Sequence, residues 1–84
     1  MGQKEKLIRK LKSGPKDFTF DDSVRLLGFF DYSISNKGKT SGSRVMFTSA
    51  IHPPILLHKP HPRKELPEYQ IKQLIEILEQ EGLI

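Results

Sequence analysis

The hydrophobic period changes twice along this 84-residue chain, and that change constrains the fold more than any other feature. In the first third, apolar residues recur at the spacing of amphipathic helices. In the middle third they alternate with polar residues, as in half-buried antiparallel strands, and the helical spacing then returns. The pattern predicts an α+β domain of order ααβββα, with a small three-stranded antiparallel sheet and helices packed on one face of it.

Two helices are expected in the first third. Residues 4–12 form an amphipathic stretch that a Ser-Gly-Pro sequence ends, and its lysines suit a solvated helix face. A capping-box pattern beginning at Thr19 opens a second helix, which we expect to end at Gly28. Phe29 and Phe30 would then fill the core beyond that helix.

Three strands are expected at residues 31–35, 44–51 and 55–58, followed by a helix from Pro67 to Gly82. Alternation divides the strand residues between two faces of the sheet. The residues expected on the buried face are Tyr32, Ile34, Val45, Phe47, Ile51, Ile55 and Leu57. The residues expected on the open face are Ser33, Ser35, Arg44, Met46, Thr48, Ala50 and His58.

Composition excludes several classes of protein. With no cysteine, the chain has no disulfides, zinc-finger thiolates or thiol nucleophile. The first residues lack the apolar run of a secretion signal, and no segment reaches the roughly 20 apolar residues of a membrane span. We therefore expect one cytoplasmic domain over residues 1–84, with no membrane association.

Charge is distributed unevenly. Residues 1–31 have a net charge of +2, residues 32–64 have +6 without a single acid, and residues 65–84 have −4. A segment with charge of one sign concentrates polyanions near it, and this favours nucleic acid as a partner over a merely solvated surface.

Two basic segments flank the open face. Residues 36–43 form a glycine-containing loop whose backbone N–H groups and side chains suit phosphate, although a soluble hairpin turn would have a similar composition. Residues 59–66 are held extended by alternating prolines. Because aromatic residues are scarce here, we expect RNA to be recognised by shape and through its backbone. The RNA-binding candidates are Lys37, Lys39, Thr40, Ser41, Ser43, Lys59, Arg63 and Lys64.

A metal site is not expected. His52, His58 and His61 could in principle be ligands, but they lie in a basic segment without a carboxylate cluster or a helical histidine pair. RNA cleavage without a metal needs only proton transfer at the 2′-hydroxyl and at the leaving oxygen, with cations near the phosphate. Histidine suits such transfers because its pKa lies near neutrality. We expect no cofactor of any kind.

The sequence resembles the HicA family of toxin–antitoxin ribonucleases. The likeness runs from the helix around residues 20–27 through Gly-Ser at 42–43 and the strand 45–47 to the closing stretch 58–83, with its Gly-Leu ending. The resemblance implies a fold like that of double-stranded-RNA-binding domains (dsRBD-like). It also implies an mRNA interferase that a HicB-type antitoxin holds inactive, with residues 1–16 as an N-terminal helical extension.

The chain departs from the family at one position. The family's catalytic histidine follows Gly-Ser, where this chain has Arg44, which stays protonated and cannot act as a base. Either His58 or His61 supplies the proton transfer with Arg44 and Lys39 as electrostatic helpers, or the protein binds RNA with little cleavage. Two further interpretations stay open: Arg44 pairs a nearby carboxylate, or the basic face docks an acidic protein. The catalytic candidates are Arg44, His58 and His61.

Overall fold

The computed structural model describes residues 2–14, 16–35, 44–60 and 63–84. In order, these residues form α1 (Gln3–Lys12), α2 (Phe20–Phe29), β1 (Tyr32–Ile34), β2 (Arg44–Ser49), β3 (Ile55–His58) and α3 (Glu68–Gln80). The predicted α+β order ααβββα is therefore confirmed.

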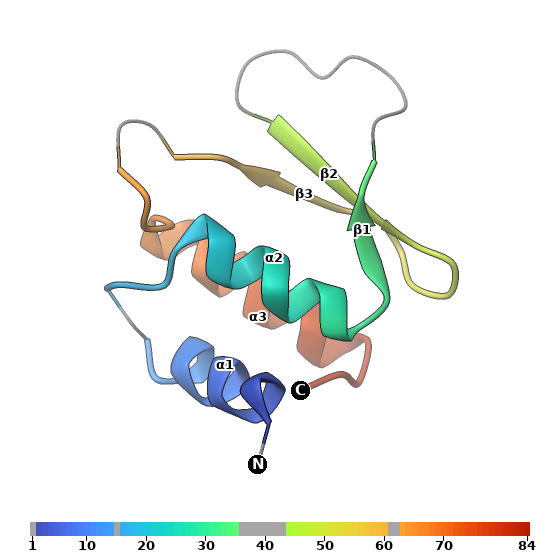
Figure 1. Cartoon of the computed structure of the whole chain (residues 1–84), viewed down its shortest axis with the longest axis horizontal. Coiled ribbons are helices and arrows are strands. Elements are labelled where there is room, and N and C mark those ends of the chain that lie inside the picture. The colour runs from blue at the N-terminus through green and yellow to red at the C-terminus, as the bar shows by residue number, and fades with distance from the viewer. Residues whose placement is uncertain (1, 15, 36–43, 61–62) are drawn as a thin grey trace.

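The strands form an antiparallel sheet in the order β1-β2-β3. Helices α2 and α3 lie against one face of the sheet, and α1 lies on the far side of these two helices (Figure 1). Phe20 at the start of α2 packs on Phe47 of β2, with ring centroids 6.0 Å apart. The sheet therefore has one face packed against helices and one face turned away from them.

The core lies between the sheet and the helices. Phe47, Ile55 and Leu57 are buried on the sheet side, and alternation had predicted all three there. Helix α1 contributes Leu7 and Leu11 to the same cluster. The segment predicted as an N-terminal extension is therefore packed into the core.

Three sequence predictions about buried residues are wrong. Ile34, the last residue of β1, was expected on the buried face but is 45% exposed. Phe29 is 49% exposed, because α2 continues past Gly28 and the helical turn directs Phe29 outward, while Phe30 is buried. Ile51 is 74% exposed, because β2 ends at Ser49. The Ser49 hydroxyl accepts the N–H of Ile51 at 3.2 Å and so turns the chain out of the strand.

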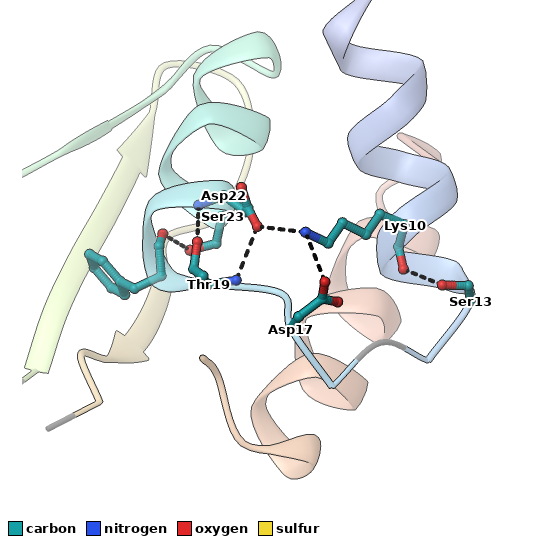
Figure 2. A network of polar contacts seen from close by, with 7 residues as sticks. Lys10, Ser13, Asp17, Thr19, Asp22 and Ser23 are labelled. Atoms are coloured by element: carbon teal, nitrogen blue, oxygen red, sulfur yellow. Dashed lines mark hydrogen bonds and ion pairs between the residues drawn. The ribbon is translucent and has the colours of Figure 1, made fainter. Parts of the chain in front are cut away.

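The ends of α1 and α2 are joined by a polar network (Figure 2). The predicted capping box is present, since the Thr19 hydroxyl accepts the N–H of Asp22 and the Asp22 carboxylate accepts the N–H of Thr19. Lys10 of α1 places its Nζ 3.2 Å from that carboxylate and 3.8 Å from Asp17. Asp22, which is part of the N-terminal cap of α2, therefore also holds α1 in place.

Candidate functional site

The cross-strand pair Arg44 and His58 stands at one end of the open sheet face. Arg44 is the first residue of β2, His58 is the last of β3, and the antiparallel register makes them direct partners. Because Val45 and Leu57 face the helices, their neighbours Arg44 and His58 face the other way. Arg44 is exposed and His58 is half-buried. Side chains of directly opposed residues approach closely, so both can reach the same bound group.

The rest of the open face has an apolar centre and a polar end. Met46 and Leu56, both half-buried, are partners beside the Arg44–His58 pair. Ser33 and Thr48, both exposed, are partners between β1 and β2. In the part of the chain that the structure describes, no helix covers this face (Figure 1). The surface is accessible to a macromolecule and is too open to enclose a small one.

The side chain of Gln70 in α3 fixes the position of His58. Its amide oxygen accepts the His58 N–H at 2.7 Å, and its NH₂ group donates to the His58 carbonyl at 3.0 Å. Gln70 is only 2% exposed, so this pair of bonds is shielded from water. The sequence reading missed Gln70, although a glutamine four and eight residues before buried Leu74 and Leu78 is a signal for a buried polar contact.

The basic segment after β3 is anchored to the start of α2. The Phe20 N–H donates to the Lys64 carbonyl at 3.0 Å, and the Leu66 N–H donates to the Phe18 carbonyl at 2.8 Å. Exposed Lys59 lies with its Nζ 6.0 Å from the Phe20 ring centroid. These contacts hold Lys59, Arg63 and Lys64 around a small hollow of about 260 Å³ at the α2 N-terminus.

Several predicted site residues lie outside the described part of the chain. The structure places Arg44, His58, Lys59, Arg63 and Lys64, all at or after the shared end of β2 and β3. The remaining candidates belong to the segments 36–43 and 61–62, which are not described: His61, Lys37, Lys39, Thr40, Ser41 and Ser43.

His52 has a different environment. It lies in the turn between β2 and β3, at the end of these strands opposite His58. Its Nδ1 is 3.0 Å from the Glu81 carboxylate, and its ring stacks on Tyr32 at 6.1 Å. Burial, and then the negative charge of Glu81, raise the pKa of Tyr32, whose hydroxyl donates to the Pro53 carbonyl at 2.7 Å. These contacts join the sheet to the end of α3.

A metal-binding cluster and a membrane-spanning helix are both absent from the described residues. Within them, no three or more histidine, aspartate or glutamate side chains gather as they would around a metal ion. None of their helices combines the length and the apolar character needed to cross a membrane.

Comparisons with known proteins assign neither a family nor a function to this chain. No family model, curated protein or solved structure matches this chain.

Proposed function

We propose that the protein is a HicA-like, metal-independent ribonuclease that binds mRNA on the open sheet face. The observation that supports this most is the pairing of Arg44 with His58 on the face turned away from the helices. Lys59, Arg63 and Lys64 continue the positive charge from that pair, and the whole segment 44–64 contains no acid. The RNA backbone is a polyanion that such a surface attracts.

The chemistry follows from the residue types. His58 takes the proton of a ribose 2′-hydroxyl, whose oxygen then attacks the adjacent phosphorus. Arg44 stabilises the extra negative charge that builds up on the phosphoryl oxygens. The bond to the 5′-oxygen breaks, and this oxygen receives a proton from a protonated histidine, either His58 or His61, leaving a 2′,3′-cyclic phosphate. No metal or other cofactor takes part.

The biological setting proposed with this activity is a toxin–antitoxin pair in the cytoplasm. A HicB-like antitoxin would keep the ribonuclease inactive until it is removed. A gene for a small HicB-like protein beside the gene for this chain would support that setting.

A second function is favoured by the identity of residue 44. An arginine stays protonated, so it binds phosphate well but accepts no proton. If His58 alone cannot complete the proton transfers, the same surface makes a non-catalytic RNA-binding module. This alternative keeps the dependence of RNA binding on Arg44 and removes its dependence on the His58 imidazole.

Cleavage of a structured mRNA in EDTA tests the proposal. We expect wild type to cut, His58→Ala to lose most activity, and Arg44→Ala to lose both activity and affinity. Arg25→Ala is the matched control, since it removes an exposed arginine from α2, on the helical side of the sheet. Appearance of 2′,3′-cyclic phosphate ends identifies the reaction.

The result that contradicts cleavage is equally specific. The variant Arg44→His introduces the histidine that the HicA family has at this position. If RNA stays intact with both wild type and this variant, the proposed ribonuclease activity is contradicted. Binding that weakens with Arg44→Ala and not with His58→Ala would then establish the non-catalytic module.

A further inference from the structure

A large open groove adjoins the candidate site on the side of β3 away from β2. It has a volume of about 1040 Å³ and lies between the end of α1, the segment after β3 and the first turns of α3. His58 and Lys59 line it and also belong to the proposed RNA surface. The groove and the proposed RNA surface therefore meet at these two residues.

Positive charge dominates the groove. Among the described residues, five lysine or arginine side chains line it against two glutamates. Glu68 pairs with one of these lysines, since its carboxylate lies 3.5 Å from Lys72 Nζ, and this pair leaves four cations against Glu65. The cations come from three separate places in the chain: α1 and the turn after it, the segment after β3, and α3. The cations are Lys12, Lys16, Lys59, Arg63 and Lys72.

The groove also has an aromatic wall and an apolar floor. Tyr69, in the first turn of α3, is 62% exposed and lines it. Ile71 and Leu66, both buried, and half-buried Ile75 lie beneath. Proteins that bind single-stranded nucleic acid combine a basic groove for the backbone with aromatic side chains on which bases stack. A base pair inside a duplex has no free face to offer such a ring.

We propose that this groove binds unpaired nucleotides of the RNA, with a base stacked on Tyr69 and phosphates near Lys16 and Lys72. The inference rests on the proposed function and specifies its substrate: RNA with a single-stranded segment beside the bound region, rather than continuous duplex. The inference adds base stacking to the expected recognition by shape and through the RNA backbone. The expectation considered only aromatic residues near the strands, whereas Tyr69 belongs to α3 and shares the groove with His58 and Lys59.

Tyrosine fluorescence can report directly on the binding of RNA in the groove. The sequence has no tryptophan and two tyrosines, of which Tyr32 is 5% exposed and Tyr69 is 62% exposed. Titration with an oligouridylate of about eight nucleotides should quench the fluorescence of Tyr69 by stacking. In Tyr69→Leu, where only Tyr32 emits as a tyrosine, this quenching should disappear, and affinity should fall about tenfold.

Matched variants separate stacking from loss of bulk. Phe29→Leu also removes an exposed aromatic ring, but Phe29 does not line the groove, so this variant should bind as wild type does. Tyr69→Phe keeps the ring and should retain most of the affinity. Lys16→Ala and Lys72→Ala should each weaken binding of the oligouridylate and reduce its dependence on salt.

A second comparison uses duplexes. A duplex with an unpaired overhang should bind about tenfold more tightly than the blunt duplex, and Tyr69→Leu should abolish the difference. Equal binding of both duplexes, with Tyr69→Leu neutral and Arg44→Ala harmful, overturns this inference and leaves the proposed function intact. Failure of wild type to bind any RNA overturns both. Saturable quenching of Tyr69 by an oligoglutamate peptide, without quenching by RNA, would assign the groove to an acidic protein instead.

Discussion

At the scale of single residues, Asp31 has an unusual backbone conformation and His58 has unusual backbone hydrogen bonds. Asp31, between α2 and β1, has a φ of 70°, in the left-handed region that side chains with a Cβ avoid. His58 has both of its backbone polar groups bonded to a buried side chain instead of to another strand. Each of these two residues leads to a prediction about the free energy of unfolding.

Asp31→Gly should be more stable than Asp31→Ala by about 1 kcal/mol, since only glycine adopts a left-handed conformation without a steric penalty. Asp31 is exposed, so neither variant loses buried contacts. Urea unfolding of the two variants measures the difference. Equal midpoints would mean that the left-handed conformation at this position costs nothing.

Gln70→Leu should destabilise the protein by about 3 kcal/mol, because the His58 N–H and carbonyl both lose their partner in a buried place. Gln73→Leu is the control, since Gln73 lies on the same helix but is exposed. Thermal unfolding should separate the two variants clearly. Similar stability for both would show that water replaces the amide at no cost.

At the scale of elements, α1 and α2 are fastened together through Asp22. Burial alone would raise the pKa of its carboxyl, but the Thr19 N–H and Lys10 outweigh burial, so that the pKa lies below the ordinary value. A carboxyl with a lowered folded-state pKa contributes stability above its unfolded pKa of 3.8, and this contribution is lost as the pH falls through the folded-state pKa.

Asp22→Asn should therefore lower stability at neutral pH by about 1 kcal/mol and reduce the loss of stability below pH 3.8. The control is Asp21→Asn, the same charge change at an exposed neighbouring position. Urea unfolding at a series of pH values measures both. The link between α1 and α2 would be refuted if the two variants gave the same pH dependence.

The order of elements was predictable because hydrophobic period depends on local sequence. The exact ends of the helices and strands were less predictable from the sequence. Ile51 continued the alternation of β2, and only the Ser49 hydroxyl, a local competitor for the backbone, ends the strand before it. Gly28 suggested a helix end, but α2 runs one residue further, and the left-handed residue after it is Asp31.

Placement of the site was predictable only in part. Alternation put Arg44 and His58 on the open face, and the register agrees. Alternation alone does not say which residues stand opposite each other, because the register depends on the loops between strands. The sequence did not reveal that Gln70 bonds to the backbone of His58 or that Tyr69 lines a groove with it, because both residues belong to α3 and reach β3 only through the packing of the fold.

At the scale of the whole molecule, charge is segregated. The segment 32–64 has +6 and the segment 65–84 has −4. The Arg44–His58 pair lies in the first of these, on the side of the sheet turned away from the helices. For the proposed function, this distribution of charge means that electrostatic attraction would orient RNA before any close contact forms.

This segregation predicts the salt dependence of RNA binding. Arg44→Ala should reduce the slope of log K against log salt by about one, the amount expected for one lost phosphate contact. Arg25→Ala, which makes the same charge change on α2, should leave the slope unchanged. Filter binding over a range of salt concentrations provides the measurement. An identical loss of slope in both variants would mean that only net charge matters.

The amide of Gln70 has one more consequence, for how these molecules behave at high concentration. It occupies the rim of β3 as a neighbouring strand would, and Pro53 and Pro54 lie just before the other end of that strand. A second copy that tried to pair with β3 edge to edge would find the backbone groups of His58 already bonded. Pairing of two copies is thereby opposed at this end of β3.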